Sequence, residues 1–167
     1  MFDKNFTCCF TGHREIEKRH IENLPRVLEA VLRGLISNGY FIFVVGGALG
    51  FDTIAAETVL SLKEEFPQLL LKVVAPCADQ HETWSDKDKR KYERIREAAD
   101  DYICMSASYS RDCMKRRNLE MVKMSAVCIA YCIRERTGSS QTVAFANQEG
   151  LDVIDLIPLL DYYNSNI

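Results

Sequence analysis

The sequence contains no long apolar run and no pattern that marks an exported or disulfide-bonded protein. None of its 167 residues belongs to a stretch that approaches the roughly 18 consecutive apolar positions of a membrane-spanning helix. The N-terminus lacks the apolar core of a signal peptide. The seven cysteines are odd in number and form no Cys-x-x-Cys pair. We therefore expect a cytoplasmic protein with no membrane partner, whose cysteines are reduced core residues.

An excess of positive charge and a metal-ligand pattern are also missing. Lys and Arg together number 21 against 24 for Asp and Glu, and this net charge of −3 argues against a general polyanion-binding surface, although a local basic patch stays open. The three histidines, His13, His20 and His81, are scattered, and no nucleophile elbow occurs. We expect no metal and no cofactor. The sequence is therefore as consistent with a carrier or sensor domain as with an enzyme.

The most informative stretch is an apolar run followed by a glycine turn and a helix. Residues 41–45 are all apolar, which is typical of a central parallel strand covered on both faces. Glycine allows close approach of a ligand to the backbone, and a helix N-terminus attracts anions. A ligand-free tight turn is the open alternative, and Asp52 either caps the helix or holds a ribose hydroxyl. The predicted phosphate contacts in the turn are Gly46, Gly47, Ala48 and Gly50.

Apolar runs alternate with helical patterns along the whole chain. The charged segment 15–20 is expected outside the core, and Ser110 is expected to cap a helix. This alternation predicts one domain over residues 1–167, an α/β fold with a three-layer, Rossmann-like, open and mostly parallel sheet of about six strands and helices on both faces. The expected strands are 6–11, 41–45, 69–75, 102–105, 126–131 and 153–156.

Further polar clusters follow the first, fourth and fifth expected strands, where parallel sheets bind ligands. Arg117 belongs to a group of four cations near a helix N-terminus, where they oppose the helix dipole unless an anion is present. Arg117 and Arg14 are predicted to bind phosphate, because guanidinium forks suit it. His13 is a candidate donor of a proton or a hydrogen bond. The remaining candidate ligand contacts are Gly12, Gly138, Ser139, Ser140 and Thr142, with simple helix capping by Ser140 as the alternative.

Taken in order, these motifs resemble the SLOG superfamily over nearly the whole chain. The motifs are the Thr-Gly-His-Arg segment from Thr11, the glycine turn from Gly46, the Met-Lys-Arg-Arg-Asn segment from Met114 and the Thr-Gly-Ser-Ser-Gln-Thr segment from Thr137. More narrowly the chain is similar to the YpsA-like branch. This resemblance implies a binding or sensing domain for a nucleotide or a nucleotide-derived phosphate, and it makes a homo-oligomer possible.

Two relatives within the superfamily imply alternative functions. DprA proteins bind single-stranded DNA, and LOG enzymes hydrolyse the N-glycosidic bond of a nucleoside monophosphate. The LOG resemblance assigns the functional arginine to Arg117. This sequence departs from the LOG motif at one point, because Val143, Ala144 and Phe145 follow Thr142 where the catalytic glutamate of LOG enzymes is expected. Loss of an acid/base group costs a factor of about 10² to 10⁴ in rate, so turnover is not implied.

Overall fold

The computed structural model describes residues 3–165, which alternate between strands and helices. A 3₁₀ turn, Lys4–Phe6, precedes the first strand. The strands are β1 Thr7–Gly12, β2 Ile42–Val45, β3 Leu70–Ala75, β4 Asp101–Cys104, β5 Val127–Tyr131 and β6 Asp152–Asp155. The helices are α1 Lys18–Ile21, α2 Leu24–Ser37, α3 Phe51–Glu65, α4 Asp86–Ala98, α5 Cys113–Lys123, α6 Gly138–Gln148 and α7 Leu156–Ser165.

The six strands form one parallel sheet in the order β4-β3-β2-β1-β5-β6. From β1 to β4 the chain adds strands toward one edge. It then crosses back and adds β5 and β6 on the other side of β1. The direction therefore reverses between β1 and β5, and sheets of this kind bind ligands at the carboxyl ends of the strands beside such a switch point. The predicted Rossmann-like α/β fold is confirmed.

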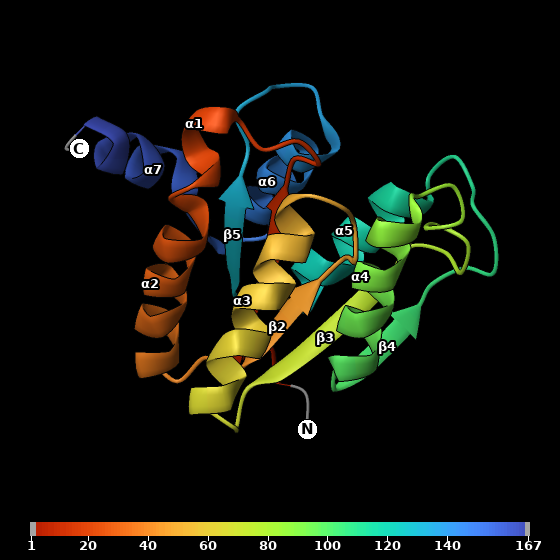
Figure 1. Cartoon of the computed structure of the whole chain (residues 1–167), viewed down its shortest axis with the longest axis horizontal. Coiled ribbons are helices and arrows are strands. Elements are labelled where there is room, and N and C mark those ends of the chain that lie inside the picture. The colour runs from red at the N-terminus through yellow and green to blue at the C-terminus, as the bar shows by residue number, and fades with distance from the viewer. Residues whose placement is uncertain (1–2, 166–167) are drawn as a thin grey trace.

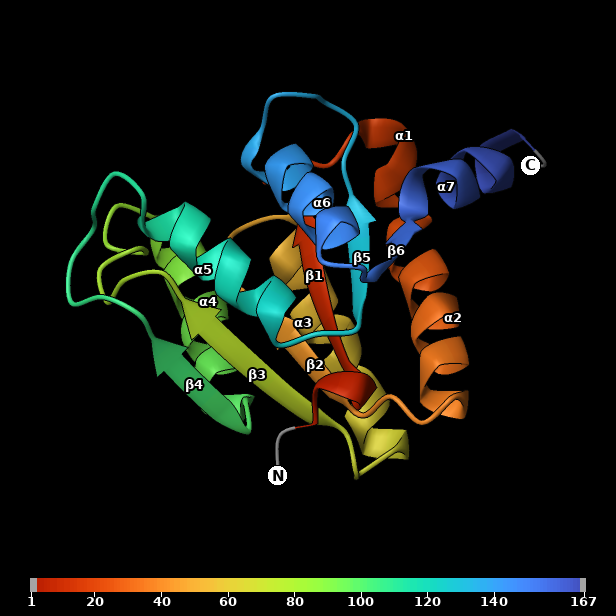
Figure 2. The same ribbon diagram turned by 180° about the vertical axis from the view of Figure 1, so that it is seen from behind.

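The crossing of the chain from β4 to β5 divides the helices between the two faces of the sheet. Figure 1 shows α2, α3 and α4 in front of the sheet, and Figure 2 shows α5 and α6 covering the opposite face. Helix α7 packs against α2 and β5, and α1 packs against α7 and α2. A three-layer arrangement results, with α5 and α6 side by side over β1.

The core lies on both faces because the strand residues alternate in direction. Cys8 and Phe10 join the larger apolar cluster under α2, α3 and α7, whereas Cys9 joins the smaller cluster with residues of α5 and α6. All seven cysteines are free and five are buried, in agreement with the prediction of reduced core residues. Cys104 is exposed.

Local expectations met with mixed outcomes. The segment 15–20 was expected outside the core, and its charged residues Glu15, Glu17, Lys18 and Arg19 are exposed. His20 is the exception: it is fully buried because Tyr131 and Asp161 satisfy its ring nitrogens at 2.7 and 2.9 Å. Helix α5 begins at Cys113 with Asp112 as its N-cap residue, so Ser110 is not the cap. The sequence also gave no indication of α7, which follows β6 without a loop.

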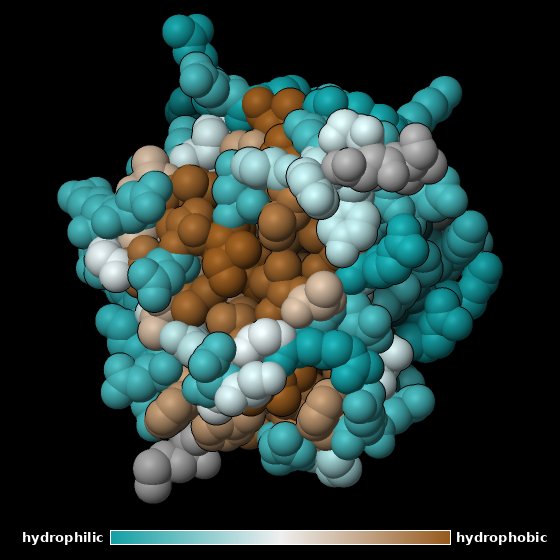
Figure 3. Space-filling model, turned by 90° about the vertical axis from the view of Figure 1, so that its left-hand side faces the viewer, coloured by the Kyte–Doolittle hydropathy of each residue, from teal (hydrophilic) through white to brown (hydrophobic). Residues whose placement is uncertain are grey.

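One side of the molecule is notably apolar. Figure 3 shows this area on the side that carries α1, α2 and α7. Large exposed apolar side chains on these helices include Ile21, 54% exposed, and Leu159, 39% exposed. Homo-oligomerisation stays a prediction. Within residues 3–165, no helix has the length and apolar character needed to cross a membrane.

Candidate functional site

The glycine turn after β2 is held by a carboxylate of its own helix. One oxygen of Asp52, Oδ2, accepts hydrogen bonds from the backbone N–H groups of Gly46 and Ala48 at 3.0 and 3.3 Å. Burial raises the pKa of the Asp52 carboxyl, and the Arg117 charge and these two N–H groups oppose that rise. Two backbone amides that were predicted to bind phosphate are thus already bonded to Asp52, and the Asp52 carboxylate holds the turn in place.

Little space remains beside the turn. A crevice of about 10 Å³ lies between the turn and α4, lined in part by Gly47, Asp52 and Trp84. This volume is close to that of one water molecule and is too small for a phosphate. Arg14 is exposed, with its guanidinium carbon 5.9 Å from the centre of the Trp84 ring. The predicted roles of these residues in phosphate binding stay predictions.

Two of the predicted glycines have clear packing reasons. A Cβ placed on Gly12 would lie 2.4 Å from the Phe51 ring, so the end of β1 can approach α3 only without a side chain. Gly50 has φ of 79° and its Cα lies against the backbone of Arg14. Gly47 has φ of 71°, a conformation that glycine adopts freely. Close approach of chain segments therefore accounts for these glycines in part.

Arg117 is buried, with 5% of its surface exposed, and it connects α5 to the glycine turn. Its Nη1 donates to the carbonyl oxygens of Gly46 and, at 3.3 Å, Val74. Its Nε donates to Asn118 Oδ1 at 2.8 Å, and Nη2 contacts the Met114 sulfur at 3.6 Å. Burial lowers the pKa of Arg117, although Asp52 opposes this shift. The guanidinium thus holds the carboxyl ends of β2 and β3 against α5.

His13 accepts hydrogen bonds where a donor was expected. Its Nε2 accepts from the backbone N–H groups of Ile133 and Arg134 at 2.8 and 3.2 Å, in the loop between β5 and α6. Burial, followed by the charge of Arg134, lowers the pKa of His13. His13 therefore joins the end of β1 to the loop on the other side of the switch point.

Helix α6 begins with a reciprocal capping box. Thr137 Oγ1 accepts from the N–H of Ser140 at 3.1 Å, and Ser140 Oγ accepts from the N–H of Thr137 at 2.8 Å. Thr142 Oγ1 donates to the Gly138 carbonyl at 2.8 Å. In the described part of the chain, no acceptor bonds the N–H groups of Gly138 and Ser139. Two amides at this helix N-terminus are thus available to a ligand.

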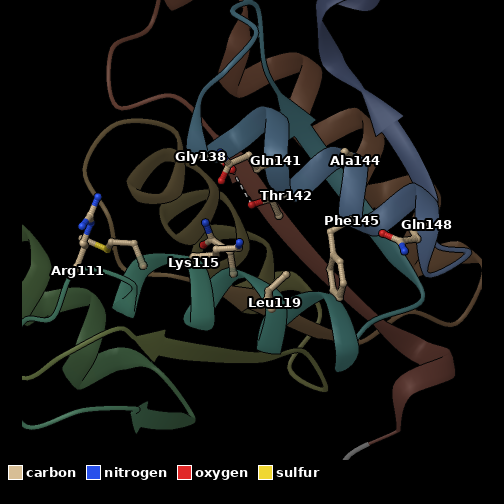
Figure 4. A pocket seen from close by; sticks show the side chains of 11 residues that line it. Arg111, Lys115, Leu119, Gly138, Gln141, Thr142, Ala144, Phe145 and Gln148 are labelled. Carbon is tan, nitrogen blue, oxygen red and sulfur yellow. Dashed lines mark hydrogen bonds between the residues drawn. The ribbon is translucent and has the colours of Figure 1, made fainter.

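A cleft of about 440 Å³ lies between α5 and α6. Figure 4 shows its walls, with Arg111, Lys115 and Leu119 along one side and Gly138, Thr142 and Phe145 along the other. Pockets for small molecules typically measure about 300–1,000 Å³. The cleft is lined by Arg111, Met114, Lys115, Asn118, Leu119, Gly138, Gln141, Thr142, Ala144, Phe145 and Gln148.

The charge in this cleft has one sign. Arg111 and Lys115 are the charged side chains among its described lining residues, and none of these residues is acidic. The N-terminus of α6 adds the positive end of a helix dipole at Gly138. Within residues 3–165, no cluster of His, Cys, Asp or Glu is arranged to hold a metal. The cleft is therefore electrostatically suited to an anion of small-molecule size.

The structure brings together only part of the predicted site. Gly138 and Thr142 line the cleft beside the cations, and Arg117 lies behind it, bonded to the lining residues Met114 and Asn118. The turn residues and His13 lie elsewhere at the carboxyl edge. Two of the four cations that the sequence analysis grouped near a helix N-terminus, Arg111 and Lys115, line the cleft, although α5 begins only at Cys113 and Arg111 therefore precedes it. Leu119 lies four residues after Lys115, and this spacing could have indicated one helix face. The lining residues that sequence reasoning did not predict are Leu119, Gln141, Ala144, Phe145 and Gln148.

Comparison with known families agrees with these motifs. The model of YpsA, described as the YspA SLOG family, matches residues 8–151. The chain belongs to this SLOG family. The matched region extends from β1 through α6, so it includes the glycine turn, Arg117 and both walls of the cleft.

Sequence relatives of this SLOG chain carry only a family-style name. UPF0398 protein BH1768 of Halalkalibacterium halodurans is 35% identical over 82 residues, which is 49% of this chain and 43% of that protein. A UPF0398 protein of Bacillus thuringiensis is 28% identical over 128 residues, 75% of this chain and 70% of the relative. The match thus spans less than half the length of the first of these relatives.

Solved structures share the fold of the SLOG chain. DprA of Streptococcus pneumoniae superposes with a TM-score of 0.65 and 19% identity, over 91% of this chain and 50% of that one. DprA of Helicobacter pylori, solved for its single-stranded DNA binding mode, superposes with a TM-score of 0.65 and 17% identity, over 92% of this chain and 66% of that one. The molybdenum cofactor binding protein of Rippkaea orientalis superposes with a TM-score of 0.55 and 18% identity, over 97% of this chain and 83% of that one. At these identities the likeness concerns the fold alone.

Proposed function

We propose that this chain binds a nucleotide or a nucleotide-derived phosphate in the cleft between α5 and α6, as a regulatory or sensing domain. The observation that carries the proposal is the charge of the cleft: its charged lining residues, Arg111 and Lys115, are both cations, and no acid lines it in the described chain. Its volume of about 440 Å³ suits one small molecule. The ligand is phosphate-bearing because cations and a helix N-terminus converge there.

The phosphate lies at the end of the cleft where α6 begins. The capping box uses the N–H of Ser140, which leaves the N–H groups of Gly138 and Ser139 for an anion. Lys115 approaches the same end from α5, as Figure 4 shows. The rest of the ligand extends along the cleft toward Leu119 and Phe145, whose apolar surfaces suit the less polar part of a nucleotide.

Binding without turnover is favoured over N-glycosidic hydrolysis. Hydrolysis needs a carboxylate near the glycosidic bond, and none lines the described cleft. Glu57, the carboxylate that follows the glycine turn on α3, lies across the sheet from the cleft and is 3.7 Å from Lys91. Single-stranded DNA is also disfavoured, because the cleft has the size of one small molecule and the chain carries a net charge of −3.

The test is a calorimetric titration with adenosine 5′-monophosphate, uridine 5′-monophosphate and inorganic phosphate at low salt. Lys115→Gln is expected to weaken nucleotide binding tenfold or more, because a charge-assisted hydrogen bond contributes about 1.5–3 kcal/mol and about 1.4 kcal/mol is tenfold. The matched control is Lys123→Gln. This exposed lysine ends the same helix outside the cleft.

Each outcome of the titration decides between the candidates. Absence of binding by all three probes, or equal binding by both variants, would contradict the proposal. Binding of a thymidine oligonucleotide with a steep salt dependence, unchanged in Lys115→Gln, would instead favour the single-stranded DNA alternative. Release of free adenine during incubation with adenosine 5′-monophosphate would favour the hydrolase.

A further inference from the structure

His13 occupies the switch point between β1 and β5 and fastens the loop that leads into α6. Only 5% of its surface is exposed. Its Nε2 accepts two backbone N–H groups, those of Ile133 and Arg134, at 2.8 and 3.2 Å. A nitrogen that accepts hydrogen bonds carries no proton, so the ring is neutral with its hydrogen on Nδ1.

The loop held by His13 leads directly into α6, which forms one wall of the cleft. Three residues after Arg134 the chain reaches Thr137, the N-cap of α6, and Gly138 follows in the wall of the cleft. Arg136 in this loop has φ of 58°, an unfavourable conformation for a residue with a side chain, so the loop needs external support. The bonds from His13 supply such support from the opposite side of the switch point.

The elements packed against His13 determine how readily its ring takes up a proton. Burial lowers the pKa of His13 below its usual 6.5, the charge of Arg134 in the β5–α6 loop lowers it further, and Glu17 before α1 opposes both. Tyr131 at the end of β5 presents its ring edge-on, with ring centres 6.1 Å apart. From α3, the N–H of Phe51 donates to the His13 carbonyl at 3.1 Å. These surroundings favour the neutral ring.

We propose that His13 is a positioning residue that holds the N-terminus of α6 in its anion-binding position only while its imidazole is neutral. Protonation of Nε2 would set an N–H against two N–H donors, so both bonds to the loop would be lost. Nucleotide binding then weakens as the pH falls, by at most about tenfold per pH unit for a single proton. This inference rests on the proposed function, because the cleft is the site whose affinity changes.

The direction of this effect separates positioning from direct contact. A histidine that touched the phosphate would strengthen binding when it became cationic, whereas the geometry at Nε2 predicts weaker binding. The substitution His13→Gln provides a conservative rescue, since the glutamine carbonyl accepts N–H groups at a similar reach and does not titrate. His81→Gln is the matched control, because this histidine lies in the loop before α4 and has no bond to Ile133 or Arg134.

The first experiment titrates adenosine 5′-monophosphate into the three proteins between about pH 7.5 and pH 5, across the range in which histidines change charge. The second phosphate ionisation, near pKa 6, affects all three titrations equally. The wild type and His81→Gln are expected to lose affinity with acid beyond this common change, and His13→Gln is expected to show the common change alone. Identical profiles for the wild type and His13→Gln would overturn the inference and leave the proposed function standing.

A second measurement needs no ligand. Nitrogen-15 NMR of the His13 ring is expected to show Nδ1–H at neutral pH, and the amide signals of Ile133 and Arg134 are expected to titrate together with the ring. A proton on Nε2 at neutral pH, or amide signals of Ile133 and Arg134 that do not shift as the ring titrates, would overturn the inference. If adenosine 5′-monophosphate fails to bind at any pH, the proposed function fails and this NMR result still decides whether His13 holds the loop.

Discussion

Replacing Gly50 by alanine tests whether the glycine turn is built for close packing of the chain. Gly50 is the N-cap of α3, with φ of 79° and ψ of −119°. A Cβ at this position would lie 2.0 Å from the Arg14 carbonyl oxygen, whereas Cβ atoms essentially never approach closer than 3.0 Å. Alanine therefore forces the β1–α1 segment away from the turn by about 1 Å.

The expected cost has two parts. With φ of 79° and ψ of −119°, the Gly50 backbone lies outside the left-handed helical region, and a residue with a Cβ in such a sparsely populated region costs about 1–3 kcal/mol. Overpacking against the Arg14 backbone adds about 1–3 kcal/mol. Gly50→Ala should thus lower the free energy of unfolding by about 2–6 kcal/mol, measured by urea denaturation of the ligand-free protein.

Two other glycines provide matched controls. Gly150 has φ of 80° with open space around its Cβ position, so Gly150→Ala should cost only the strain of its positive φ, about 1–2 kcal/mol. Gly34 lies in α2 with no atom near its Cβ position, and Gly34→Ala should stabilise by about 0.5–1 kcal/mol. If Gly50→Ala costs no more than Gly150→Ala, close approach to Arg14 is not why glycine is needed there.

Two further substitutions test the buried polar network at the same edge of the sheet. Arg117→Met should lower the free energy of unfolding by about 3–5 kcal/mol, because it removes a buried cation that bonds the Gly46 carbonyl; a loss below about 1 kcal/mol in guanidinium chloride denaturation would contradict this role. Tyr131→Phe should cost about 1–3 kcal/mol in the same assay, because it leaves the buried Nδ1 of His20 without its partner. The control Tyr109→Phe, at a tyrosine that is 64% exposed, should change stability by less than about 0.5 kcal/mol, and equal effects of the two tyrosine variants would argue against the buried bond.

The strands were predictable because each is a short apolar run, and an uninterrupted run such as 42–45 can only be covered on both faces. Helix α1 was not predictable in the same way. Its sequence is polar, and His20 is buried only because Tyr131 and Asp161, more than 100 residues away in the chain, bond both ring nitrogens. Helix α7 directly follows β6, so no turn signal separated the two.

The candidate site shows the same division. The sequence identified Arg117 as one of four cations near a helix N-terminus and Asp52 as a polar residue after the glycine turn. In the structure, Nη1 of Arg117 donates to backbone carbonyls and Asp52 accepts the turn amides. His13 was noted as a donor, and the structure makes it an acceptor, because the β5–α6 loop happens to present two N–H groups to it. Side-chain types were readable from the sequence, whereas their partners were not.

The sequence by itself determined the α/β fold class and the edge of the sheet at which polar groups gather, because apolar periodicity and local turn chemistry are properties of short segments. The family followed from the resemblance of its ordered motifs. Tertiary structure alone decided the strand order, the partners of the buried polar groups and the position of the cleft. The cleft exists because α5 and α6 cross the same face of the sheet side by side, which places Lys115 and Gly138 on opposite walls of one cleft. Contacts between segments so distant in the chain depend on how the helices pack, and short-range sequence patterns do not predict that packing.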